Sequence, residues 1–95
     1  MIESPQMSAV TIYLRPGCPY CDRAKSLLTR KGVPFTVIDI WQERERRSEM
    51  IARSGGRTTV PQIFVGERHV GGSDELHALE RAGKLDPLLS EALTP

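Results

Sequence analysis

The sequence predicts an α/β fold in which one mixed, four-stranded sheet is flanked by helices in the order β-α-β-α-β-β-α, with a short helix at the end. Three observations predict this class. Strand-like and helix-like segments alternate along the 95 residues, hydrophobic and charged residues make up 39% and 26% of the chain, and no repeat or linker divides it. We therefore expect a single domain over residues 8–95, preceded by a mobile tail over residues 1–7 that is polar and interrupted by Pro5.

The first half of the chain reads as a β-α-β unit. Residues 9–14 are apolar and β-branched and end at Pro16-Gly17, which indicates a buried strand. Residues 19–31 place apolar side chains at helical spacing, with Gly32 at the expected helix end. Residues 33–40 are again strand-like. Because a helix separates the two strands, we expect them to be parallel in a right-handed crossover.

The second half predicts a charged helix, a hairpin and two further helices. Residues 43–54 carry charges of both signs around an apolar stripe and end at a glycine pair. Residues 60–65 and 69–70 read as strands joined by a tight turn. Helices over residues 73–83 and 86–93 complete the chain, the first of them capped by its initial serine or aspartate.

Charge and hydropathy exclude several classes of partner. Thirteen basic and twelve acidic residues leave a formal charge of +1, so we expect no bulk attraction to nucleic acid or to an anionic membrane. No apolar run approaches the ~20 residues of a membrane span, and the first residues lack the features of a signal peptide. We therefore expect a cytoplasmic location. Trp41, after the second strand, is either a packing residue or a partly exposed aromatic.

Cys18 and Cys21 are the two cysteines of the chain, and their position indicates redox chemistry. Cys18 comes directly before the first helical turn, where free backbone N–H groups and the helix dipole favour a thiolate, and Arg15 adds a nearby positive charge. Pro19 suits the first helical position. Cys21 lies one turn along on the same face. The pattern predicts Cys18 as nucleophile and Cys21 as resolving thiol.

Other uses of two cysteines fit less well. A structural disulfide would close a very short loop and would not persist in a reducing cytosol. A zinc site needs about four ligands, and His69 and His77 do not follow the usual histidine spacing, so we expect no metal. Inert core cysteines do not usually begin a helix behind a Pro-Gly turn.

Thr59-Val60-Pro61 forms a second constellation, at the entry of a strand. An ordinary trans proline is one interpretation. A cis Val60–Pro61 bond is the other, and it would present the backbone of Val60 to an extended peptide ligand. The residues alone do not choose between them.

Gly71-Gly72-Ser73-Asp74 forms a third constellation, at a predicted helix start. Helix capping accounts for it in structural terms. As a binding site, the free N–H groups and Ser73 would meet a carboxylate, and Asp74 would meet an ammonium group. An α-amino acid end group carries both.

These three constellations resemble, in order and separation, the dithiol glutaredoxins of the small bacterial type. The resemblance covers about residues 9–89 and is carried by Gly17-Cys18-Pro19-Tyr20-Cys21 together with the two motifs above. It implies a thioredoxin fold, a cis bond before Pro61, and a glutathione-dependent thiol–disulfide oxidoreductase that serves as an electron carrier in cell redox homeostasis. Glutathione would be a cosubstrate, with no tightly bound cofactor. The partners implied are disulfide-containing or glutathionylated proteins, with ribonucleotide reductase among the candidates, and the protein itself is expected to be a monomer.

The resemblance also implies a set of glutathione contacts. Asp74 and its neighbours would hold the γ-glutamyl end, the backbone of Val60 would pair with the cysteinyl part, and Arg15 would meet the glycyl carboxylate, with Arg57 a weaker candidate. Arg15 stands where the family commonly has lysine. The full set of glutathione-binding residues implied is Arg15, Tyr20, Thr59, Val60, Pro61, Gly72, Ser73 and Asp74.

Two rival functions remain at this point. One is a thioredoxin reduced by a flavoprotein, in which the contacts expected at residues 71–74 for a carboxylate and an ammonium group would have no ligand to bind. A carrier of an iron–sulfur cluster between two chains would use Cys18 and glutathione as ligands. Pro19 and Tyr20 argue against the carrier, since cluster-binding relatives usually have smaller or different residues there.

Overall fold

The computed structural model describes residues 9–93 and confirms the predicted α/β class. Its mixed sheet has the strand order β2-β1-β3-β4. The elements are β1 (Val10–Leu14), α1 (Pro19–Arg30), β2 (Phe35–Asp39), α2 (Arg46–Arg53), β3 (Gln62–Val65), β4 (Arg68–Gly71), α3 (Ser73–Arg81) and α4 (Leu85–Leu93). Within these residues no helix is both long and apolar enough to cross a membrane. The tail predicted over residues 1–7 lies outside the described part of the chain.

Strand directions bring three loops to one end of the sheet. β1 and β2 are parallel and connected by α1, as the β-α-β pattern predicts. β3 is antiparallel to both β1 and β4. The carboxyl ends of β1 and β4 and the amino end of β3 therefore lie at the same end of the sheet. This arrangement gathers the three constellations singled out in the sequence.

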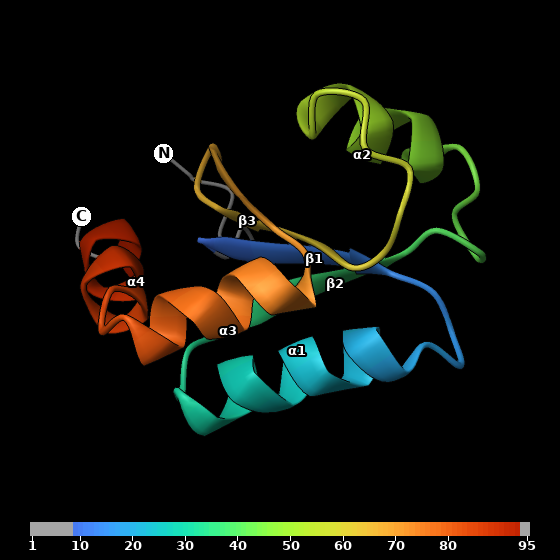
Figure 1. Ribbon diagram of the computed structural model, residues 1–95. Helices are drawn as coiled ribbons and strands as arrows, with labels where there is room; N and C mark the ends of the chain where they lie inside the picture. The colour runs from blue at the N-terminus through green and yellow to red at the C-terminus, as the bar shows by residue number, and fades with distance from the viewer. Residues whose placement is uncertain (1–8, 94–95) are drawn as a thin grey trace, which may run out of the picture.

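The two faces of the sheet are covered by different helices. Figure 1 shows α1 and α3 on one face and α2 on the other. Because successive residues of a strand point to opposite faces, Ile12 packs in the core beneath α1 and α3, whereas Tyr13 packs beneath α2 with Phe64 and Met50. Both faces are thus buried, which explains the nearly continuous apolar run of β1.

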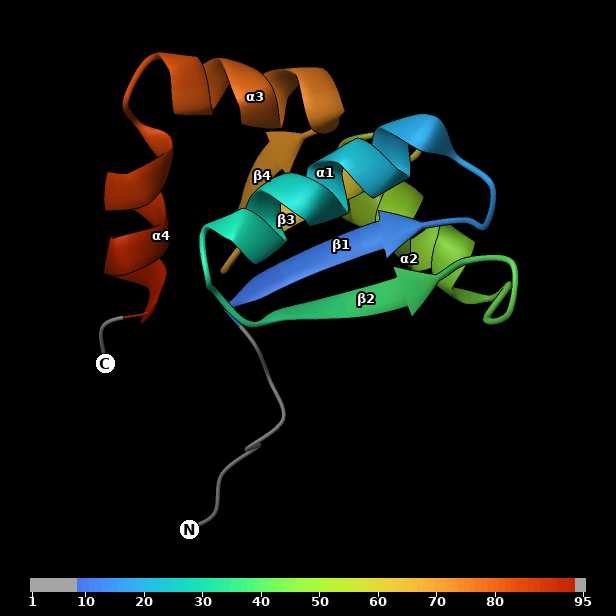
Figure 2. The same cartoon turned by 90° about the horizontal axis from the view of Figure 1, so that it is seen from below.

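One lysine connects the carboxyl ends of α1 and α3 with the amino end of α4. Lys31 follows α1, and its Nζ lies 2.7 Å from Glu80 of α3 and 2.9 Å from Asp86 of α4. Figure 2 shows α4 beside the end of α3, next to the ends of the strands where β1 and β2 begin. These ion pairs fix the helix ends that lie away from the cysteines.

The second helix is shorter than the sequence predicts. A helix is expected over residues 43–54, but α2 spans Arg46–Arg53. Asp39 turns the chain immediately after β2, because its Oδ1 accepts the backbone N–H groups of Trp41 at 2.8 Å and of Gln42 at 3.2 Å. Residues 43–45 continue in turns, closed by hydrogen bonds from Arg46 N to Glu43 O at 2.8 Å and from Arg47 N to Arg44 O at 3.2 Å, and the helix begins only after them. Trp41 lies in that turn with 62% of its surface exposed, so it is the surface aromatic and not the packing residue.

Candidate active site

Cys18 occupies the position directly before α1. Its backbone is extended, and its Sγ accepts the backbone N–H of Cys21 at 3.3 Å, so the sulfur itself caps the helix. Gly17 has a φ of +73°, which the turn from β1 into the helix requires and which glycine adopts without strain. Pro19 is the first helical residue. The sulfur of Cys18 therefore lies at the amino terminus of α1, toward which the free backbone N–H groups and the helix dipole are directed.

Cys21 lies one turn further and is a different kind of thiol. Both cysteines are free, and only 4% of Cys18 and 1% of Cys21 is exposed. Burial, followed by the hydrogen bond with Cys18, raises the pKa of Cys21 to about 12. Cys21 is therefore protonated near neutral pH. The pair is asymmetric, with one sulfur held at a helix end and its neighbour held as a buried thiol.

The segment before β3 forms the next wall of the site. The Val60–Pro61 peptide bond is cis, which is the alternative that the family resemblance implies. Val60 packs against the core cluster that contains both cysteines. Val60 also packs against the cluster beneath α2, and it lines the same cavity as Tyr20, the residue directly before Cys21.

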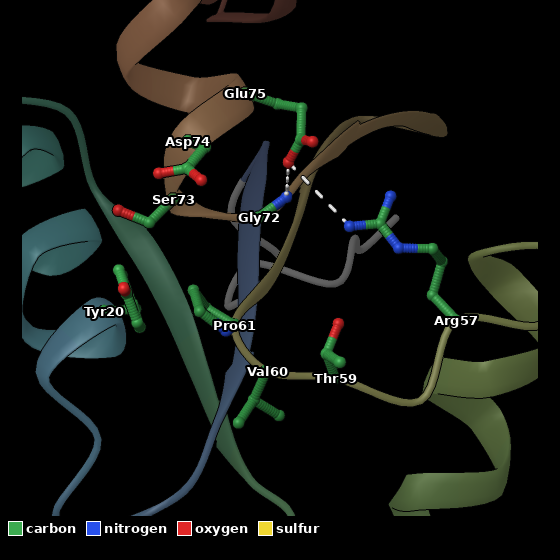
Figure 3. A pocket seen from close by; sticks show the side chains of 9 residues that line it. All are labelled: Tyr20, Arg57, Thr59, Val60, Pro61, Gly72, Ser73, Asp74 and Glu75. Atoms are coloured by element: carbon green, nitrogen blue, oxygen red, sulfur yellow. Dashed lines mark hydrogen bonds and ion pairs between the residues drawn. The ribbon is translucent and has the colours of Figure 1, made fainter.

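A cavity of about 280 Å³ lies where these walls meet α3. Figure 3 shows its side chains: Tyr20 from α1, then Thr59, Val60 and Pro61, with the first residues of α3 opposite. Seven of the eight residues expected to bind glutathione line it: Tyr20, Thr59, Val60, Pro61, Gly72, Ser73 and Asp74. Such a volume lies near the lower end of pockets that hold small molecules. The fold thus brings together residues that are more than 50 positions apart in the chain.

The amino terminus of α3 supplies the polar wall. The sequence predicts a cap from Ser73 or Asp74, but the residue before the helix is Gly72 and Ser73 is already helical. Glu75 explains the difference, because its Oε1 accepts the backbone N–H of Gly72 at 2.6 Å and so performs the capping. That hydrogen bond is the main cause of the lowered pKa of Glu75. Asp74 is left exposed at the cavity.

Arg57 provides the positive charge among the side chains that line the cavity. It is the weaker of the two candidates in the sequence, whereas Arg15 is exposed in the loop before Cys18 and does not line the cavity. Arg57 Nη2 lies 3.8 Å from Glu75 Oε1, an ion pair drawn in Figure 3. Glu75 is the lining residue that the sequence analysis missed. Its spacing, three residues after Gly72, is the signal that could have found it.

The two histidines considered as zinc ligands have protein partners. His69 Nε2 lies 2.7 Å from Gln62 Oε1, and His77 Nδ1 lies 2.8 Å from the carbonyl oxygen of Ser73. Across residues 9–93 no three histidine, cysteine or acidic side chains are grouped so that they could hold a metal ion.

Known proteins resemble this chain both in sequence and in fold. The family model "Glutaredoxin" matches residues 10–70. A protein named "Glutaredoxin" from Pseudomonas aeruginosa is 62% identical over 84 residues, which are 88% of this chain and 99% of that protein. "Glutaredoxin 3" from Escherichia coli K12 is 55% identical over 83 residues, covering 87% of this chain and 99% of the relative. The crystal structure of a buckwheat glutaredoxin–glutathione complex aligns with a TM-score of 0.82 and 31% identity, over 90% of this chain and 79% of that one.

Proposed function

The chain belongs to the glutaredoxin family of glutathione-dependent thiol–disulfide oxidoreductases, and we propose that Cys18 is its nucleophile, Cys21 its resolving thiol and the cavity beside them its glutathione site. The observation that carries the proposal is the asymmetric dithiol next to a cavity that offers both acidic and basic groups.

The first step is attack by the Cys18 thiolate. On a glutathionylated protein, it attacks the glutathione sulfur, so a Cys18–glutathione disulfide forms and the protein thiolate leaves. A second glutathione thiolate then attacks the glutathione sulfur, releasing oxidised glutathione and the Cys18 thiolate. The helix amino terminus favours both the attacking and the departing state of Cys18, because it stabilises the charged sulfur in each case. This route uses one protein thiol.

Reduction of a protein disulfide uses both thiols. Cys18 forms a mixed disulfide with one substrate sulfur and expels the other as a thiolate. Cys21 then loses its proton and attacks Cys18 Sγ, which forms the Cys18–Cys21 disulfide and expels the second substrate sulfur as a thiolate that takes up a proton. Two glutathione molecules restore the dithiol and become one molecule of oxidised glutathione. The hydrogen bond between the side chains of Cys21 and Cys18 supports this intramolecular step.

The cavity offers partners for each end of glutathione. Asp74 would bind the α-ammonium group, and the N–H groups at the start of α3, with Ser73, would bind the α-carboxylate. The backbone of Val60 would pair with the cysteinyl residue. Arg57 would bind the glycyl carboxylate from inside the cavity, with Arg15 approaching from the loop before Cys18. Glutathione bound this way would present its sulfur toward Cys18.

The proposal also names the reductant, the substrates and the location of the protein in the cell. Glutathione is the reductant, and disulfide-containing or glutathionylated proteins are the substrates, with ribonucleotide reductase a candidate among them. The protein would act in the cytoplasm as a monomer and would need no tightly bound cofactor, because thiols alone carry the electrons.

Activity with glutathione tests the proposal. The purified chain should reduce a small glutathione mixed disulfide, and Cys18→Ser should abolish this activity. Cys21→Ser should retain it and lose reduction of a protein disulfide, since only that route needs the second thiol. Ser26→Ala, an exposed change on the same helix, serves as control and should behave as wild type. Equal loss on both substrates in Cys21→Ser would refute the division of labour between the thiols.

A further inference from the structure

Gln62 is a fully buried polar side chain directly after Pro61 and lies outside the cavity. It is the first residue of β3 and pairs in register with Tyr13 of β1. Directly opposed residues share one face of a sheet, so Gln62 lies on the face covered by α2. A buried amide must find partners within the protein, since an unsatisfied one is costly. The partners that Gln62 finds reveal its role.

The amide of Gln62 bonds back to the segment that lines the cavity. Its Nε2 donates to the carbonyl oxygen of Thr59 at 3.0 Å and contacts Thr59 Oγ1 at 3.2 Å. Thr59 and Val60 lie between α2 and β3, outside regular secondary structure. Without the ladder hydrogen bonds of a strand, their orientation depends on such side-chain contacts. Gln62 therefore fixes the peptide that precedes Val60.

His69 in turn fixes Gln62. Its Nε2 lies 2.7 Å from Gln62 Oε1, and its ring stacks on Phe64 with centroids 4.9 Å apart. Because the carbonyl of Thr59 can only accept, the nitrogen of the amide must face Thr59 and its oxygen must face His69. That oxygen also accepts, so His69 Nε2 carries a hydrogen and donates it. The three residues thus form a row of hydrogen bonds that runs from His69 in β4 through Gln62 to Thr59 in the wall of the cavity.

The charge state of His69 is compatible with its hydrogen bond to Gln62. Burial and the nearby positive charge of Arg57 lower the pKa of His69, so the imidazole is neutral near pH 7. In that state one ring nitrogen carries the hydrogen, and the hydrogen bond to Gln62 selects Nε2.

We propose that Gln62 and His69 are positioning residues for glutathione: they hold Thr59, and through it Val60, in the orientation that binds the tripeptide. The inference rests on the proposed function of the cavity and deepens it. Neither residue touches the cavity, so neither is expected to change the chemistry at Cys18. Their loss should weaken binding of glutathionylated substrates while leaving the thiol reaction intact.

Two variants test the two hydrogen bonds of Gln62 separately, the one with Thr59 and the one with His69. Gln62→Met keeps the length of the side chain but removes both contacts with Thr59. His69→Phe keeps a ring against Phe64 but removes the N–H donor. At saturating glutathione, the KM for a glutathionylated peptide should rise about tenfold in Gln62→Met and about threefold in His69→Phe, with kcat unchanged. The rate of alkylation of Cys18 by iodoacetamide should stay at the wild-type value.

Tyr13→Phe is the matched control. Tyr13 lies on the same face and its hydroxyl bonds with Glu49 and Arg53, so its removal also destabilises this layer but leaves Thr59 untouched. Its melting temperature should fall while its KM stays at the wild-type value. An unchanged KM in Gln62→Met and His69→Phe, or an equal rise in Tyr13→Phe, would overturn the inference. If Gln62→Met does not fold, His69→Phe decides alone. A wild-type protein that does not prefer glutathionylated substrates would instead refute the proposed function of the cavity.

Discussion

Cys21 should remain protonated well above the pH at which an ordinary cysteine ionises. Its pKa is raised from 9.0 to about 12, so at about pH 9 roughly one Cys21 in a thousand is a thiolate, against one in two for an unperturbed thiol. Burial is the largest cause, and the contact with Cys18 adds to it. Replacing Cys18 with serine removes the second cause and keeps the first. The pKa of Cys21 in Cys18→Ser should therefore fall, yet stay above 9.0.

A titration of protein labelled with ¹³C at the cysteine Cβ measures this directly. The Cβ shift of Cys21 should stay constant to about pH 10 in wild type. In single-turnover experiments on protein glutathionylated at Cys18, release of glutathione should accelerate about tenfold per pH unit from 6 to 9, because the fraction of Cys21 thiolate grows by that factor. A plateau below about pH 8.5, or a titration of Cys21 near 9, would refute the assignment of a buried thiol.

The remaining predictions concern the cavity and α3. Asp74→Asn should raise the KM for a glutathionylated peptide about tenfold at constant kcat, because a charge-assisted contact is lost; an unchanged KM would remove Asp74 from the site. Arg57→Gln should weaken the binding of reduced glutathione but not of its glycyl ester, which a KM measurement with each reductant would show. Equal effects on both KM values would point to another partner for the glycyl carboxylate. Gly71→Ala should lower the melting temperature more than Gly83→Ala, because a Cβ at Gly71 would lie 2.8 Å from Glu75 whereas the one at Gly83 meets nothing within 4 Å. Equal melting temperatures would contradict that clash.

Patterns of neighbouring residues predict most of the fold. The β-α-β unit and the hairpin follow from hydropathy and glycine positions, because each signal is local. The start of α2 does not follow, since a helix-like charge pattern continues through residues 43–45 while the side chain of Asp39 turns the backbone. A side chain that bonds to the chain ahead of it overrides helix propensity there.

The sequence predicts part of the site, and there is a physical reason why it does not predict the rest. Cys18 and the start of α3 carry short motifs whose chemistry depends on residues close in sequence. Arg57 lies in the loop between α2 and β3 and Glu75 lies in α3, so their ion pair depends on how that loop and α3 meet. Gln62 and His69 are likewise joined only by the register of β3 and β4. Contacts of this kind exist only after the sheet has formed.

Two helices present their amino termini to the same cavity, since Tyr20 of α1 and the first residues of α3 both line it. Beside the charge of Arg57, the peptide dipoles of both helices add a positive potential there, and backbone amides do not titrate. This attraction for a thiolate and for a carboxylate is therefore constant at every pH at which the fold survives, and no side-chain substitution removes it. The helices thus contribute a potential that does not change with pH. The pH dependence of thiol–disulfide exchange therefore comes from the sulfurs and from the charged side chains around them.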